Sequence, residues 1–253
     1  MKRYIYKQLL AWKNEKEHNP LILNGARQVG KTYILREFGR NEYKRMAFFS
    51  LDRDQKALEI FNKGGRATDM LMALSAICHE DITPHDTLVV LDEIQNCPKA
   101  LEALKFFCEE TPEIDIVVAG SLLGLSIHSG VSYPVGKVEE LHLYPMTFLE
   151  FLEAMGKTQL VNLLENKNWT VINMLETELI SSLRQYYYVG GMPAAVLAHI
   201  EKKGWKEVRR IQQQIITDYR RDFSKHAPTR EIPRINMVWD SICLLYTSPS
   251  PRD

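Results

Sequence analysis

The stretch Gly25-Ala26-Arg27-Gln28-Val29-Gly30-Lys31-Thr32 decides the fold of this chain. It matches the pattern G-x-x-x-x-G-K-[ST], whose glycines let backbone N–H groups surround a phosphate without a Cβ in the way. Lys31 is predicted to reach the β- and γ-phosphates of a nucleotide, and the Thr32 hydroxyl is predicted to bind Mg²⁺. The alternative is a glycine-rich turn between a strand and a helix that binds nothing.

The segments on either side of this loop favour binding. Pro20 to Leu23 is short, apolar and strand-like, and Lys31 to Phe38 has a composition compatible with a helix. Phosphate binding needs a strand that aims the loop and a helix N-terminus that receives the anion. We therefore predict that a nucleotide is bound by the whole loop, Gly25, Ala26, Arg27, Gln28, Val29, Gly30, Lys31 and Thr32.

Two adjacent acids end an apolar strand further along the chain. Thr87 to Leu91 has the composition of a buried strand, and Asp92 and Glu93 follow it directly. Carboxylates delivered by a buried strand are costly unless they have a chemical task. In nucleotide hydrolases the first acid holds Mg²⁺ through water and the second polarises the attacking water. Asp92 is thus the predicted metal-side acid and Glu93 the predicted general base. A strand end with two solvated acids is the alternative.

A third apolar strand, Asp115 to Ala119, leads into Gly120 and Ser121. In hydrolases of this kind a polar residue at such a strand tip senses the γ-phosphate, and Ser121 is the candidate. An ordinary turn explains the Gly-Ser pair equally well, so both interpretations stay open.

The composition narrows the class of protein. The 253 residues are 45% hydrophobic and 25% charged, as in ordinary soluble globular proteins. Lys and Arg number 32, as do Asp and Glu, so no overall basic excess points to nucleic acid, although local patches remain open. No apolar run approaches the ~20 residues of a membrane span, and the N-terminus lacks a secretory signal. The cysteines show no C-x-x-C spacing, so reduced thiols and a cytoplasmic location are expected.

The order of predicted elements favours an α/β fold. Strands are predicted over Pro20–Leu23, Met46–Leu51, Thr87–Leu91, Asp115–Ala119 and Val138–Leu143, and helices over Tyr4–Trp12, Gln55–Phe61, Thr68–His79 and Pro98–Glu109. This alternation predicts a parallel sheet with helices on both faces. Residues 146–242 are largely helical, with breaks at Gly156, at Gly190-Gly191 and at Pro193. We expect a core over residues 1–145 and a helical lid or linker over 146–242.

The last eleven residues, Cys243 to Asp253, break the pattern of everything before them. This Ser- and Pro-rich segment can be back-translated into a DNA sequence that looks like the transposase-end adapter used in short-read library preparation. We therefore expect residues 243–253 to be a sequencing artefact and the native protein to continue past Ile242, which makes this chain a fragment. A natural disordered tail is the alternative.

The chain resembles the prokaryotic AAA-type ATPases whose C-terminal half is a domain of unknown function. The resemblance is carried by Pro20–Thr32, Leu91–Pro98, Ala119–Gly124, Tyr133–Val138, Leu143–Leu152, Tyr188–Pro193 and Asp218–His226. It implies a P-loop NTPase core in which the strand ending at Ser121 lies between those ending at Gly25 and Asp92. It also implies ATP and Mg²⁺ as ligands, and a missing C-terminal domain similar to restriction-endonuclease-like folds. Many relatives carry Gly-Arg at Gly136-Lys137; lysine lacks the planar fork of arginine, so Lys137 is assigned no catalytic role.

These observations predict an AAA-type, Mg²⁺-dependent ATPase that acts as a molecular switch. Lys31, Glu93 and Ser121 are the predicted catalytic residues, and Thr32 and Asp92 the predicted metal-binding pair. The alternative is a nucleotide-regulated DNA-binding or nuclease-associated module in which ATP binding matters more than turnover. The expected partners are ATP, the missing C-terminal domain and either DNA or a protein, with no membrane partner. 

Overall fold

The computed structural model describes residues 1–120, 133–226 and 230–245, with the backbone alone described for residues 223–226 and 242–245. The chain divides into two compact units, Met1–Pro193 and Ala194–Asp253, which are described separately below. The predicted boundary between a core and a lid at residue 145 falls inside the first unit and stays a prediction.

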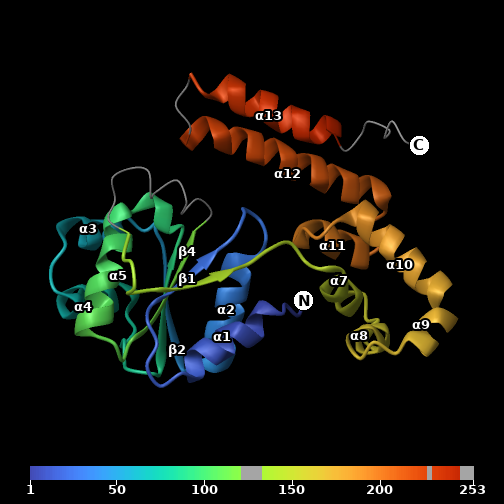
Figure 1. Cartoon of the computed structure of the whole chain (residues 1–253). Coiled ribbons are helices and arrows are strands. Elements are labelled where there is room, and N and C mark those ends of the chain that lie inside the picture. Colours follow the sequence, from blue (N-terminus) through green and yellow to red (C-terminus); the bar gives the residue numbers. More distant parts are fainter. Residues whose placement is uncertain (121–132, 227–229, 246–253) are drawn as a thin grey trace. The chain divides into compact units, whose positions relative to one another are not determined.

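The first unit contains a five-stranded parallel sheet with the strand order β2-β3-β4-β1-β5 (Figure 1). The strands are β1 (Leu21–Asn24), β2 (Arg45–Ser50), β3 (Thr87–Asp92), β4 (Asp115–Gly120) and β5 (Glu139–His142). Every residue of β3 and β4 is buried, because helices cover both faces of the sheet. The predicted α/β class is confirmed, and β4 lies between β1 and β3 as the resemblance implies.

Helices cover the two faces of this sheet in different numbers. One face is covered by α1 (Ile5–Asn14) and α2 (Lys31–Glu42), and the other by α3 (Gln55–Lys63), α4 (Ala67–Cys78) and α5 (Pro98–Glu110), the last preceded by the short 3-10 helix η1 (Ile94–Asn96) (Figure 1). The alternation of side chains along β1 divides the core, since Leu21 and Leu23 pack with α1 and α2 while Ile22 packs with α3 to α5.

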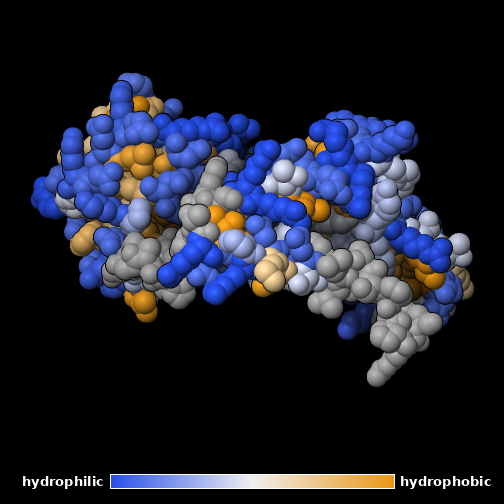
Figure 2. Space-filling model, turned by 90° about the horizontal axis from the view of Figure 1, so that it is seen from above, coloured by the Kyte–Doolittle hydropathy of each residue, from blue (hydrophilic) through white to orange (hydrophobic). Residues whose placement is uncertain are grey.

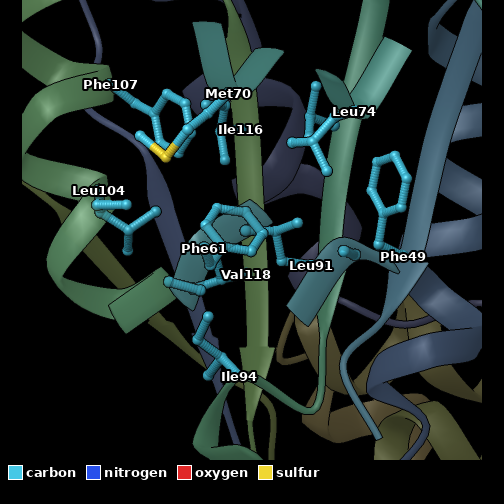
Figure 3. Packing of buried hydrophobic residues seen from close by; sticks show 14 of the residues in the cluster. Phe49, Phe61, Met70, Leu74, Leu91, Ile94, Leu104, Phe107, Ile116 and Val118 are labelled. Atoms are coloured by element: carbon cyan, nitrogen blue, oxygen red, sulfur yellow. The ribbon is translucent and has the colours of Figure 1, made fainter. Parts of the chain in front are cut away.

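The larger of the two core clusters lies between strands β2, β3 and β4 and helices α3 to α5. Figure 3 shows ten labelled apolar side chains of this cluster pointing toward one another from the strands and from the surrounding helices. The rings of Phe61 and Phe107 meet edge to face, with centroids 6.5 Å apart. This packing fixes β3 and β4, and with them the positions at which the polar strand ends emerge.

The rest of the first unit is helical. It comprises α7 (Phe148–Ala154), α8 (Thr158–Glu165), α9 (Trp169–Met174) and α10 (Glu176–Val189), and α11 (Pro193–Ile200) begins where the unit ends. The predicted breaks are confirmed, because Gly156 and Gly190 adopt positive φ angles of 76° and 72° beyond helix ends. The breaks after Glu165 and Met174 were not predicted, since neither position carries glycine or proline.

The second unit contains two long helices, α12 (Trp205–His226) and α13 (Ile232–Leu245). The rings of Tyr219 and Trp239 stack across them with centroids 6.1 Å apart, and Arg220 pairs with Asp240. Helix α13 continues to Leu245, three residues beyond Ile242, and the origin of residues 243–253 stays a prediction.

The described surface is largely polar. On the face seen in Figure 2, hydrophilic residues predominate and the hydrophobic residues form small separate areas. Among the described helices, none has both the length and the apolar character needed to cross a bilayer.

Candidate functional site

The loop between β1 and α2 has a backbone that only certain residues allow. Gly30 precedes α2 with a φ of 99°, and Gln28 also has a positive φ of 63°. A Cβ on Gly25 would lie 2.4 Å from the carbonyl oxygen of Leu143, so a side chain there cannot fit without backbone movement. Within the described residues, no side chain caps the N-terminus of α2 and its first turn carries no acid. The loop and helix therefore present backbone donors suited to an anion.

Lys31 is folded back onto this loop. Its Nζ donates to the carbonyl oxygens of Gly25 at 2.8 Å and Ala26 at 2.9 Å, and the residue is 8% exposed. Burial lowers the pKa of Lys31, and the charge of Arg27 acts in the same direction, against the opposing charges of Glu93 and Asp92. An ammonium group that donates to neutral carbonyls is a good partner for an incoming phosphate, because a charged acceptor is stronger than a neutral one.

Thr32 and Asp92 meet at the end of β3. The Thr32 hydroxyl donates to Asp92 Oδ2 at 2.7 Å, and Asp92 is 4% exposed. Burial raises the pKa of Asp92, as does the charge of Glu93, while the hydrogen bonds from Thr32 and from the Glu93 N–H lower it. A hydroxyl and a carboxylate at this distance are an oxygen pair of the kind that Mg²⁺ prefers, so the residues fit the ion.

Glu93 leaves the sheet through an unusual backbone conformation. Its φ of 58° and ψ of 45° lie in the left-handed region, which non-glycine residues rarely adopt outside strained or functional positions. The Glu93 N–H donates to Asp92 Oδ1 at 3.1 Å, and its Oε2 accepts a hydrogen bond from Gln95. Gln95 was not among the predicted site residues, although its place two positions after the acid pair was a usable signal.

The structure thus brings Lys31, Thr32, Asp92 and Glu93 together at one edge of the sheet. Ser121 lies outside the described residues, so its predicted role is open. The strand before it ends at Gly120, which is in register with Asn24 at the start of the loop. Lys137 forms an ion pair with Glu109 at 3.1 Å.

Arg3 is a second residue of the site that the sequence analysis did not predict. Its Nη1 donates to the carbonyl oxygen of Val29 inside the loop, at 2.9 Å. The two residues are 26 positions apart, and a single arginine near the N-terminus carries no local pattern that could have predicted the contact.

Comparison with protein-family profiles identifies two regions of the chain. The profile of a family described as AAA domain matches residues 17–152, and that of a domain of unknown function, DUF8612, matches residues 180–248. No curated protein matches the chain.

Three solved structures are similar to this chain to different degrees. A Walker-type ATPase of Pyrococcus abyssi is 16% identical with a TM-score of 0.55, over 90% of this chain and 76% of that one. Drosophila ORC bound to DNA is 17% identical with a TM-score of 0.46, over 83% and 65% of the two chains. Cdc6p of Pyrobaculum aerophilum is 17% identical with a TM-score of 0.40, over 62% and 50%. Only the first similarity is strong enough to support the fold.

Proposed function

This chain belongs to the AAA domain family, and from that premise we propose that it binds ATP with Mg²⁺ at Gly25–Thr32 and hydrolyses the nucleotide. The observation that carries the proposal is the 2.7 Å contact between Thr32 and Asp92, which joins the end of the loop to the acid pair. A glycine-rich turn that binds nothing gives no reason to bury a carboxylate beside it, since burying a charge is costly.

The phosphates are bound by the backbone N–H groups of the loop and by Lys31. The Lys31 ammonium exchanges its two carbonyl acceptors for phosphate oxygens, which are stronger acceptors because they are charged. The N-terminus of α2 adds a favourable dipole to the same site.

Thr32 and Asp92 supply oxygens on the metal side of the site. Mg²⁺, when bound, neutralises charge on the phosphates and orients them for attack. A cation at this position also relieves the cost of burying the Asp92 carboxylate.

Glu93 is the proposed base that takes a proton from the attacking water. The hydrogen bond from Gln95 restricts the rotamer of the Glu93 carboxylate, which favours a fixed direction of proton transfer. Ser121 is the proposed sensor of the γ-phosphate. Hydrolysis would change the placement of the helical residues 146–242, so that the protein acts as a switch.

The test uses two substitutions with matched controls. Lys31→Ala should abolish the thermal stabilisation of the protein by Mg·ATP, whereas Lys44→Ala, at an exposed lysine paired with Asp86, should not. Glu93→Gln should retain ATP binding and lose turnover by ~10²-fold or more. Glu80→Gln, at a half-exposed residue, is its control.

Equal stabilisation of the parent and Lys31→Ala by Mg·ATP would refute binding at the loop. Unchanged turnover in Glu93→Gln would assign the base to another residue. Binding without turnover in the parent, with and without DNA, would favour the alternative in which ATP regulates a DNA-binding or nuclease-associated module.

A further inference from the structure

Arg3 contacts three separate parts of the first unit. Its Nη1 donates to the carbonyl of Val29 at 2.9 Å, its Nη2 donates to the carbonyl of Tyr144 at 2.6 Å, and its Nε pairs with Glu150 Oε1 at 3.1 Å. The Arg3 and Glu150 side chains are 6% and 5% exposed. Such a contact set depends on the planar fork of the guanidinium, which lysine cannot reproduce.

Glu150 connects the same arginine to the first turn of α7. Its Oε1 also accepts the backbone N–H of Tyr4 at 2.8 Å, and its Oε2 accepts the backbone N–H of Thr147 at 2.8 Å. The Thr147 hydroxyl in turn accepts the Glu150 N–H at 3.2 Å, which completes a capping box. The start of α7 is therefore held by the carboxylate that is paired with Arg3.

The contact with Val29 affects the geometry of Gly25–Thr32, the proposed phosphate-binding loop, which is called the phosphate loop below. The Val29 carbonyl and the Gly30 N–H belong to one planar trans peptide group and point in opposite directions. A donor that fixes the carbonyl therefore fixes the direction of the N–H. The Val29 side chain is fully buried in the cluster with α1 and α2, which restricts movement of this peptide further.

We infer that Arg3 is a positioning residue for the nucleotide, which aims the Gly30 N–H and, through Glu150, couples occupancy of the loop to the first turn of α7. The inference rests on the proposed ATP binding at Gly25–Thr32 and names a regulation of that site. A bound phosphate that shifts the Val29–Gly30 peptide also shifts Arg3, and through Glu150 it shifts the first turn of α7. Because coupling between sites is reciprocal, a change in the position of α7 also changes the affinity for nucleotide.

A purely structural role for this ion pair makes a different prediction. Breaking a buried pair lowers stability whether or not the pair affects a ligand. The affinity for nucleotide, compared between variants that are equally destabilised, separates the two roles.

The experiment measures the melting temperature and the dissociation constant for Mg·ATP on the full chain. Arg3→Lys and Glu150→Gln should each weaken Mg·ATP binding by about tenfold, the effect of losing one charge-assisted hydrogen bond. Leu74→Ala, which truncates a fully buried side chain in α4, should lower the melting temperature and leave the dissociation constant unchanged. Arg66→Lys, at an exposed pair with Asp69, should change neither.

A second measurement does not depend on Arg3→Lys. In the parent, addition of Mg·ATP should change the hydrogen exchange of the backbone amides of Glu150 and Phe151 in α7, and Glu150→Gln should abolish that change. This measurement decides the question even where Arg3→Lys fails to fold.

The outcomes distinguish this inference from the proposed function. A parent that does not bind Mg·ATP refutes the proposed function, and with it the inference. If the parent binds Mg·ATP and Lys31→Ala does not, the proposed function stands. In that case parental affinity in both Arg3→Lys and Glu150→Gln, or unchanged exchange in α7, overturns the inference alone.

Discussion

Replacement of Gly25 by alanine tests the close approach that shapes the phosphate loop. The new Cβ would lie 2.4 Å from the carbonyl oxygen of Leu143 and 3.2 Å from Val29 Cγ2. Carbon–oxygen contacts in proteins begin near ~3.3 Å, so the loop and the chain after β5 must separate by about 1 Å. Overpacking of this kind costs about 1–3 kcal/mol. Restoring the binding geometry then costs up to the same amount, which corresponds to a loss of about 5- to 150-fold in affinity for Mg·ATP.

Gly39→Ala is the matched control. Its Cβ would lie 2.5 Å from Met46 Sδ and 3.0 Å from Met46 Cγ, so it would overlap a flexible side chain and not backbone. Alanine also favours the interior of α2 by about 0.5–1 kcal/mol over glycine. We expect its free energy of unfolding to stay within about 1 kcal/mol of the parent, with unchanged nucleotide affinity.

Urea unfolding and equilibrium binding of Mg·ATP measure both variants. Parental stability and parental affinity in Gly25→Ala would show that the contact with Leu143 imposes no constraint. Equal losses in Gly25→Ala and Gly39→Ala would show that the distinction between a backbone and a side-chain contact is wrong.

Two further predictions concern pH. Burial raises the pKa of Asp92, so on acidification its carboxylate should become protonated at a higher pH than an ordinary aspartate. The affinity for Mg·ATP should fall over the same pH range. An affinity that stays constant down to about pH 4 would contradict this prediction. For His18, burial lowers the pKa, but the carboxylate of Asp115, 3.4 Å from its Nε2, outweighs burial and raises the pKa above 6.5. A raised folded-state pKa adds stability that is fully present below about pH 6.5 and lost as pH rises through the folded-state value. His18→Asn should therefore cost more stability at about pH 5.5 than at about pH 8.5, and equal costs at both would exclude the charged pair.

Contiguous patterns in the sequence predicted most of the fold. The phosphate loop and the acid pair each occupy a few neighbouring residues, and short apolar runs marked the buried strands β3 and β4. The observed bounds of α3, α4 and α5 lie within two residues of the predicted ones. These features are local, because backbone hydrogen bonding and side-chain periodicity act over a few residues.

The packing of Tyr186 illustrates what a local pattern leaves open. Its hydroxyl donates to the carbonyl of Met146 at 2.8 Å, and its ring packs against Phe148 and Phe151. The adjacent residues Tyr187 and Tyr188 are 74% and 50% exposed. Three identical side chains in a row gave no indication of which one faces the interior, since that depends on the position of α7 against α10.

The sequence by itself determined where the glycine-rich loop Gly25–Thr32 and the acid pair lie in the chain, and it determined the parallel α/β class. The tertiary structure alone decided that Gly25 abuts Leu143, that Arg3 reaches Val29 and that Arg3 pairs with Glu150 over 147 positions. The physical reason is that a loop motif specifies the backbone it needs, whereas partners so distant in sequence meet only after the sheet and its helices have packed. No periodicity in the chain reports which distant side chain will lie beside a given carbonyl.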